Sequence, residues 1–257
     1  MKQAFIFSVS DNDAESSYCY LSLLLLESLV ATNPGADVYC AILTDRPPCI
    51  KLIKELENRC NVIVDPRFRV NGHRNYFLRP ATCGYFSHLL SRYDQLVYSD
   101  IDAVYTNKFT FELPPYSFLH EEWTDQILLE VEGRIPEFHT FPWLNIVTDT
   151  NKFLYDSFMK DSFDPNEFRF EQFCTDVKSS GLNLVHNDFT TIYPYRPYQP
   201  HHQAFHYDGF IYCGYAFMLK RLSFYDRLEP IINKYFNFKQ IVPFYWERRA
   251  RRSTNPA

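Results

Sequence analysis

The sequence predicts an α/β fold in which a mostly parallel central sheet is flanked by helices. Three observations support this prediction. Short apolar runs alternate with helical patterns over the first hundred residues, two of these runs end in acidic turns, and hydrophobic residues make up 46% of the 257-residue chain. That share is typical of globular proteins and excludes wholesale disorder. Alternation of buried strands with helices is typical of a parallel sheet of Rossmann type.

The first strand, the first helix and the second strand follow one another directly. Residues 4–9 and 38–43 are short apolar runs rich in β-forming residues, so both are expected to be buried strands. The residues between them predict one long helix over 15–31, which the Asn-Pro-Gly turn at 33–35 ends. The helix face expected to be buried contains Leu21, Leu24, Leu25, Ser28 and Leu29.

The next elements continue the alternation. The proline pair at 47–48 predicts the start of a second helix, because proline is favoured in the first helical turn. A third strand is expected at 61–64, a helix at 79–92 and a fourth strand at 95–98. The first hundred residues therefore alternate between strand and helix throughout.

The second half is less regular and contains no internal repeat or linker. Its apolar runs at 144–147, 182–185 and 210–219 are short. Prolines in the tract 193–200 exclude a helix there and predict an extended loop. We therefore expect one domain over residues 1–257 with a mixed C-terminal half.

Charge and composition argue against a nucleic-acid partner. Lys and Arg number 26 against 31 Asp and Glu, whereas nucleic-acid binders carry a basic excess. Only 7 glycines are present, which argues against several glycine-rich phosphate loops. A basic cluster occurs only in the tail 246–257, at Arg248, Arg249, Arg251 and Arg252. Such a tail is typical of a solvated chain end, and the alternative is a peripheral contact with a membrane surface.

The cysteines and the apolar stretches favour a cytoplasmic protein. The 7 cysteines are scattered without a Cys-x-x-Cys pair, which predicts buried free thiols in a reducing compartment. The longest apolar stretch, 18–31, is interrupted by polar residues and is shorter than the roughly 20 residues of a membrane span. We therefore expect no transmembrane segment.

Asp100 and Asp102 are the strongest candidates for chemistry. They follow the fourth predicted strand, and residues i and i+2 of an extended chain point to the same side. Sheets of this type bind ligands at the carboxyl ends of their strands, where both acidic turns fall. Two carboxylates there suit Mg²⁺ or Mn²⁺ holding a diphosphate. The alternative is a solvated acidic turn.

Two further groups extend this hypothesis. Asp11 and Asp13 form the second acidic turn, where a carboxylate can cap the following helix or accept a hydrogen bond from a nucleobase. His206 follows the proline-rich tract, and a neutral imidazole suits a third metal ligand beside two carboxylates. A structural or exposed histidine is the alternative.

Four blocks resemble segments of GT-A-fold glycosyltransferases, most closely the retaining group that includes glycogenin and bacterial lipopolysaccharide galactosyltransferases. The blocks are FIFSVSDNDAESSYCYLSLLLLESL, YDQLVYSDIDAVYTN, Phe170-Glu171-Gln172 and HYDG. They are similar to the family's opening strand, turn and helix, its D-K-V-L-Y-L-D-x-D segment, its acidic-Gln pair and its closing H-[FY]-x-G. They occur in the family's order.

The resemblance implies a metal-dependent transferase that takes a nucleoside-diphosphate sugar, expected to be a UDP-sugar, and a glycan or glycoconjugate acceptor. It gives Mn²⁺ or Mg²⁺ the ligands Asp100, Asp102 and His206. It divides the chain into a nucleotide-binding half, 1–106, and a sugar and acceptor half, 107–245. The residues expected to contact the donor are Phe7, Ser8, Asp11, Tyr18, Arg79, Asp100 and Ile101.

The stereochemical course decides which residues would act on the sugar. An inverting enzyme needs a carboxylate base near the acceptor hydroxyl. The candidates are Asp208, Glu121, Glu122 and Asp125. A retaining enzyme needs no such base, and Glu171 and Gln172 would then lie near the anomeric carbon. Arg79 or Lys220 would stabilise the leaving diphosphate.

Two departures from the family fall on the sugar and acceptor side. The family's F-N-[AS]-G segment corresponds here to Phe-Pro-Trp-Leu-Asn at 141–145. The usual Lys-Pro-Trp after the closing glycine is also missing. The nucleotide and metal half is therefore the better match.

Two other functions are open at this point. Residues 100–104, DIDAV, fit the D-x-D-x-[TV] motif of haloacid-dehalogenase phosphohydrolases, in which the first Asp is a nucleophile. That class expects its motif on the first strand and a later acidic motif that this chain lacks. A non-catalytic carbohydrate-binding module is the third function, because aromatic residues make up 18% of the chain and exposed rings stack on sugars.

Overall fold

The structure, a computed structural model, describes most of the chain, and the statements below refer to that part. It comprises residues 1–9, 17–42, 50–65, 78–120, 143–160, 167–192, 199–206 and 219–236. The basic tail 246–257 and most of the proline-rich tract lie outside it.

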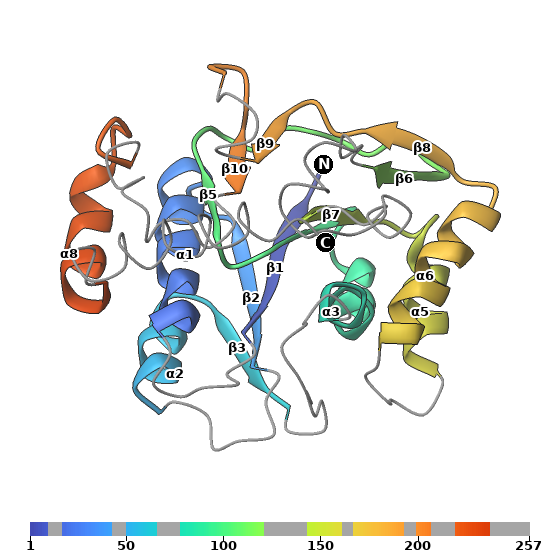
Figure 1. Ribbon diagram of the computed structural model, residues 1–257, viewed down its shortest axis with the longest axis horizontal. Coiled ribbons are helices and arrows are strands. Elements are labelled where there is room, and N and C mark those ends of the chain that lie inside the picture. The colour runs from blue at the N-terminus through green and yellow to red at the C-terminus, as the bar shows by residue number, and fades with distance from the viewer. Residues whose placement is uncertain are drawn as a thin grey trace, which may run out of the picture.

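A five-stranded, mostly parallel sheet forms the centre of the molecule and confirms the predicted α/β fold (Figure 1). The strands lie in the order β3-β2-β1-β4-β7. Their bounds are Gln3–Val9 for β1, Asp37–Ile42 for β2, Asn61–Val64 for β3, Gln95–Ser99 for β4 and Leu144–Val147 for β7. The first four are parallel, and β7 runs antiparallel to β4. The four strands predicted from the first hundred residues are all present.

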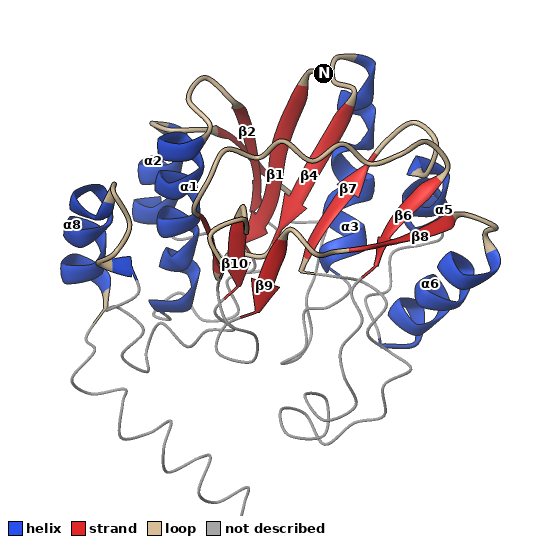
Figure 2. Cartoon of the chain, turned by 90° about the horizontal axis from the view of Figure 1, so that it is seen from above, coloured by secondary structure: helices blue, strands red, loops and turns tan. Residues whose placement is uncertain are grey.

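Helices cover both faces of this sheet, with α1, α2 and α8 on one side and α3, α5 and α6 on the other (Figures 1 and 2). The first group spans Leu21–Thr32, Ile50–Glu57 and Tyr225–Tyr235. The second group spans Leu78–Phe86, Lys152–Lys160 and Glu167–Ser179. Alternation along the strands separates two hydrophobic cores, because Phe5 and Phe7 of β1 pack with α1 while Ala4 and Ile6 pack with α3.

The helix predicted at 79–92 is divided in two. Helix α3 ends at Phe86, and a 3₁₀ turn at Ser87–Ser91 follows it. The hydroxyl of Ser87 donates to the carbonyl of Gly84, and that of Ser91 donates to the carbonyl of His88. Serine hydroxyls that bond to carbonyls one turn back compete with the regular helical pattern. The tighter turn is therefore a local effect of these serines.

Two smaller sheets lie beside the central one. Strands β5 (Ala103–Tyr105), β10 (Ala204–His206) and β9 (Thr190–Ile192) form one of them in the order β5-β10-β9. Strands β6 (Ser117–His120) and β8 (Asn183–His186) form a parallel pair. The apolar run at 182–185 therefore falls largely in β8, while the run at 210–219 lies outside the described residues except for Leu219.

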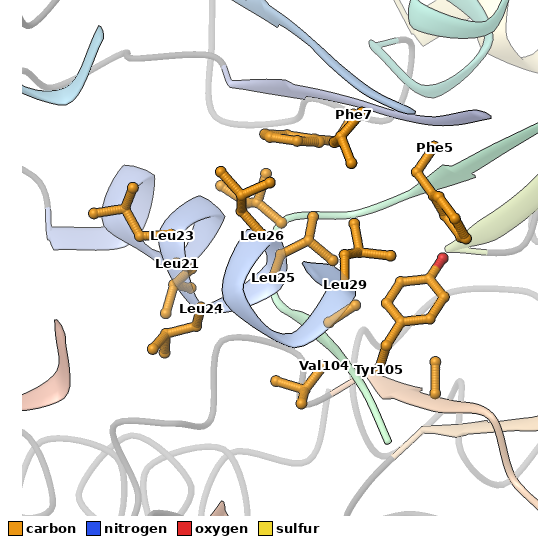
Figure 3. Close-up of a cluster of buried hydrophobic side chains, with 14 of the residues drawn as sticks. Phe5, Phe7, Leu21, Leu23, Leu24, Leu25, Leu26, Leu29, Val104 and Tyr105 are labelled. Atoms are coloured by element: carbon orange, nitrogen blue, oxygen red, sulfur yellow. The ribbon is translucent and has the colours of Figure 1, made fainter. Parts of the chain in front are cut away.

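Helix α1 is buried on all sides over its first six residues, Leu21 to Leu26, whereas the sequence predicted one buried face. Its buried residues are Leu21, Ser22, Leu23, Leu24, Leu25, Leu26, Ser28 and Leu29. Phe7 of the central sheet lies on one side of the helix and Val104 of β5 on another (Figure 3). Helix α8 also packs against it. The part of a helix that neighbours enclose has no solvated face to keep polar, and this explains the extra buried leucines in the first half of α1.

Two polar residues of the α1 region hold the chain that follows the acidic turn. The Ser28 hydroxyl accepts the backbone N–H of Tyr105 at 3.0 Å. The side-chain oxygen of Asn33 accepts the backbone N–H of Phe109 at 2.8 Å. Asn33 also ends α1, as predicted, and Gly35 follows in the left-handed conformation with φ +80°. These bonds fix β5 against the helix because a buried backbone donor needs a partner.

The described cysteines are free thiols, as predicted. They are Cys19, Cys40, Cys60, Cys83 and Cys174. Cys49 and Cys213 lie outside the described residues. None of the described helices combines the length and the apolarity needed to cross a membrane.

Gly84 of α3 lies directly against α5, and replacing it with alanine tests this packing. An added Cβ would lie 2.4 Å from the Met159 Cγ atom and 2.8 Å from the Tyr155 carbonyl oxygen. Gly→Ala in a helix ordinarily gains about 1 kcal/mol. We instead expect Gly84→Ala to lower the free energy of unfolding by about 1–3 kcal/mol in urea titrations, because the backbone carbonyl cannot move aside.

Ser179→Ala provides the control, because Ser179 is an exposed residue at the end of α6. It should change the free energy of unfolding by less than about 0.5 kcal/mol. A gain in stability for Gly84→Ala would contradict the close packing of the two helices.

Candidate metal centre

The strand order places a ligand site at the carboxyl ends of β1 and β4. From β1 the chain continues to β2 on one side, while β4 lies on the other side of β1. The direction in which strands are added therefore reverses between β1 and β4. Ligands of open α/β sheets bind at this switch point. Asp100, Ile101 and Asp102 follow β4 there.

The pairing of β5 with β10 brings His206 to the same place. The strands are antiparallel, and His206 is the register partner of Ala103. The Nε2 atom of His206 consequently lies 2.9 Å from Asp102 Oδ1 and 3.7 Å from Asp100 Oδ2. One candidate ligand atom from each of the three residues lies within 4.8 Å of the others. No second group of three or more His, Cys, Asp or Glu residues with this spacing occurs among the described residues.

The chemistry of this cluster fits a divalent cation. The side chains of Asp102 and His206 are each only 5% exposed, and that of Asp100 is 15% exposed. Buried carboxylates are costly unless they are paired or bind a metal. Carboxylate oxygens suit Mg²⁺ and Mn²⁺, and a neutral imidazole nitrogen is a ligand for several divalent transition metals. The predicted ligands Asp100, Asp102 and His206 therefore lie together with a suitable set of donor atoms.

Arg79 contacts the first of these carboxylates with two nitrogen atoms. Its Nε donates to Asp100 Oδ1 at 3.1 Å, and its Nη2 donates to Asp100 Oδ2. The Arg79 side chain is 13% exposed, so the ion pair is largely removed from solvent. Two-pronged Arg–carboxylate contacts are among the stronger ion pairs in proteins. The predicted donor-binding residue Arg79 is thus part of the cluster.

The first turn of α3 carries Arg79 to this position. The Thr82 hydroxyl lies 2.7 Å from the Ser8 hydroxyl and 2.6 Å from the Leu78 carbonyl oxygen, and all of Thr82 is buried. Ser8 belongs to the carboxyl end of β1. Residues i and i+3 share a helix face, so this contact with Thr82 also directs Arg79 toward the sheet end. Pro80 is tolerated because the first helical turn needs no internal donors.

Tyr98 forms a hydrogen bond with Asp100. Its hydroxyl donates to Asp100 Oδ1 at 2.7 Å. Burial raises the pKa of the Tyr98 hydroxyl, and the adjacent Asp100 carboxylate raises it further. Burial also raises the pKa of the Cys83 thiol, with a smaller contribution from Asp100. Both groups therefore stay protonated, and the neutral Tyr98 hydroxyl acts as a hydrogen-bond donor to the Asp100 carboxylate.

Trp143 covers His206 and connects β7 to the acidic turn. The two rings are stacked with centroids 5.3 Å apart and an interplanar angle of 29°. The backbone N–H of Asp100 donates to the Trp143 carbonyl oxygen at 2.9 Å. Trp143 is 1% exposed, and its indole N–H makes no hydrogen bond to the described residues. The ring thus restricts the orientation of the imidazole from one side.

Three predicted donor contacts are described, and their environments differ. Phe7 is fully buried in the core that contains α1, so its ring has a packing role. Ile101 is 7% exposed and belongs to the same core. Ser8 is buried and held by Thr82. Contacts of these residues with a nucleotide stay predictions.

The remaining predicted residues are not brought to the cluster by the described structure. Asp11 and Asp208 lie outside the described residues, as do Glu121, Glu122 and Asp125. Tyr18 lies in the 3₁₀ turn Ser17–Tyr20 before α1, and Glu171 lies in α6, but neither side chain is described. Gln172 is exposed on α6, where its amide donates to Asp176 at 2.8 Å. Lys220 is exposed.

Sequence reasoning missed Tyr98, Thr82 and Trp143. The contact of Tyr98 with Asp100 could have been predicted, because the two residues are two positions apart in an extended chain and point to the same side. Thr82 also had a usable signal, since it lies one helical turn after Arg79. Trp143 had none, because its contact depends on the pairing of β7 with β4.

No protein-family model matches the chain, and no curated protein is significantly similar to it in sequence. Support for a function therefore comes from the geometry of the cluster and from the motif pattern.

A double-mutant cycle tests the ion pair between Arg79 and Asp100. We expect the two residues to couple by about 1–3 kcal/mol when Arg79→Gln, Asp100→Asn and the double variant are unfolded in urea. The reason is that removing one partner leaves the other charge largely buried without its counter-ion. A change in one residue should therefore cost more stability than the same change when the partner is already gone.

The pair Lys152 and Asp149 serves as a control, because its side chains are 41% and 71% exposed. Exposed pairs are screened by solvent and couple weakly. Equal coupling in the two pairs would mean that the Arg79–Asp100 contact does not form as described.

Proposed function

We propose that the protein is a glycosyltransferase that binds a nucleoside-diphosphate sugar, expected to be a UDP-sugar, with the help of Mn²⁺ or Mg²⁺. One observation carries the proposal. Asp100, Asp102 and His206 converge at the switch point of the sheet, although 103 residues separate Asp102 from His206 in the sequence. Sheets of this kind bind nucleotides at that position.

The motif pattern supports the same conclusion. The acidic pair follows the strand beside β1, and the histidine of the HYDG block meets it through β10. These are the positions that the resemblance to GT-A-fold glycosyltransferases gives to the metal ligands. The GT-A architecture itself is part of the proposal.

The residues of the cluster would have different roles in binding the donor. Asp100, Asp102 and His206 would hold the cation, which supplies positive charge to the leaving diphosphate. Arg79 adds a fixed guanidinium on the same side, where it can stabilise the charge that develops as the bond between sugar and phosphate breaks. The hydrogen bond from the Tyr98 hydroxyl would hold Asp100 in place, and the stacked Trp143 ring would hold His206. Neither side chain adds a charge to the site.

The acceptor side is assigned by chemistry alone. In the transfer, an acceptor hydroxyl forms a bond to the anomeric carbon, the diphosphate leaves and the hydroxyl proton is lost. An inverting course would assign that proton to a carboxylate such as Asp208. A retaining course would place Glu171 and Gln172 beside the sugar instead.

Asp102→Asn tests the proposal, because it keeps the shape of the side chain and removes its charge. We expect the variant to lose Mn²⁺-dependent hydrolysis of UDP-sugars and to bind Mn²⁺ and UDP at least about tenfold more weakly in titration calorimetry. Asp149→Asn is the charge-matched control, since the Asp149 side chain is 71% exposed on the surface and should leave both unchanged.

Unchanged Mn²⁺ and UDP binding in a folded Asp102→Asn variant would refute the metal assignment. Hydrolysis of a generic phosphomonoester such as p-nitrophenyl phosphate would favour the phosphohydrolase alternative. Glycan binding that needs neither nucleotide nor metal would favour the non-catalytic alternative.

A further inference from the structure

The metal cluster contains a positive charge of its own. Arg79 reaches both oxygens of Asp100 from α3, and the two side chains are 13% and 15% exposed. We propose that Arg79 is an internal counter-ion of the metal centre, which weakens metal binding in the free protein and makes it depend on an anionic ligand such as a diphosphate. This inference rests on the proposed function of the site.

The hydrogen bonds around Asp100 support the proposal. A carboxylate offers about four lone-pair positions. Arg79 occupies one on each oxygen, and the Tyr98 hydroxyl occupies a second position on Oδ1. Among the contacts of the described residues, the position left open is on Oδ2, the oxygen that lies 3.7 Å from His206 Nε2. A cation can therefore reach Asp100 from the side of His206, but it shares the carboxylate with the guanidinium.

The charges lead to the same conclusion. With a neutral imidazole, the two carboxylates and Arg79 together carry one negative charge. A divalent cation would leave this partly buried group with one excess positive charge. Without Arg79 the same cation would neutralise the two carboxylates. Charge left uncompensated away from solvent is unfavourable, so Arg79 opposes binding of the metal alone.

A diphosphate changes this balance. Its negative charge compensates the excess that metal and guanidinium create together, and Arg79 can pair with its oxygens. Metal and diphosphate would then each raise the affinity of the site for the other, as linkage requires. Arg79 would thereby suppress metal binding in the absence of the donor.

The test compares Mn²⁺ affinity in wild type, Arg79→Gln and Arg92→Gln. Electron paramagnetic resonance of free Mn²⁺ measures the affinity with and without saturating UDP, after correction for Mn²⁺ bound by UDP itself. Arg92 is an exposed residue with its guanidinium over the Tyr93 ring at 5.7 Å, so it controls for the change in net charge.

We expect Arg79→Gln to bind Mn²⁺ about tenfold more tightly than wild type in the absence of UDP. The factor by which UDP strengthens Mn²⁺ binding should fall by a similar amount, while Arg92→Gln behaves like wild type. Urea unfolding confirms that each variant is folded. The Arg79→Lys variant, which keeps the charge but not the two-pronged contact, should stay closer to wild type than Arg79→Gln.

Equal or weaker Mn²⁺ binding by a folded Arg79→Gln variant would overturn the inference. Asp102→Asn separates this failure from that of the proposed function. If wild type binds Mn²⁺ and Asp102→Asn does not, the metal site stands and only the role of Arg79 fails. If neither wild type nor Arg79→Gln binds Mn²⁺, the proposed function fails with it.

Discussion

Providing polar partners for two largely buried carboxylates is the constraint on which the candidate site depends. Asp100 and Asp102 lie side by side at the end of β4, where solvent screens their charges poorly. The chain supplies a separate partner for each. Arg79 approaches Asp100 from α3, and His206 approaches Asp102 from β10. Helix α3 and strand β10 are therefore both positioned so that each brings one side chain into contact with one of the two carboxylates.

Polar contacts in the surrounding core position these partners. The contact between Thr82 and Ser8 fixes the first turn of α3 to β1, and the Ser28 hydroxyl fixes β5 to α1. Buried hydroxyls of this kind cost stability when they lack partners, so each favours one arrangement over its alternatives. The apolar cores on the two faces of the sheet contain most of the buried side chains, and the hydroxyl contacts determine how α3 and β5 lie against their neighbours.

The first half of the fold could be predicted from sequence because its signals are local. Each strand there is a short apolar run, and each helix has a recognisable start or end, such as the Asn-Pro-Gly turn after α1. The burial of α1 on more than one face could not be predicted in this way, since it depends on β5 and α8 covering the helix from outside. For the site, Asp100 and Asp102 followed from strand position, whereas Trp143 depends on the register between distant strands.

The pairing of Ala103 with His206 also determines when the site can exist during synthesis of the chain. The ribosome releases the acidic turn long before it releases His206, so the growing chain carries both carboxylates without their histidine. Contacts between residues far apart in sequence are costly in entropy and form late. The sheet around β1 can assemble first, and the complete set of metal ligands comes together only when nearly all of the described chain has been made.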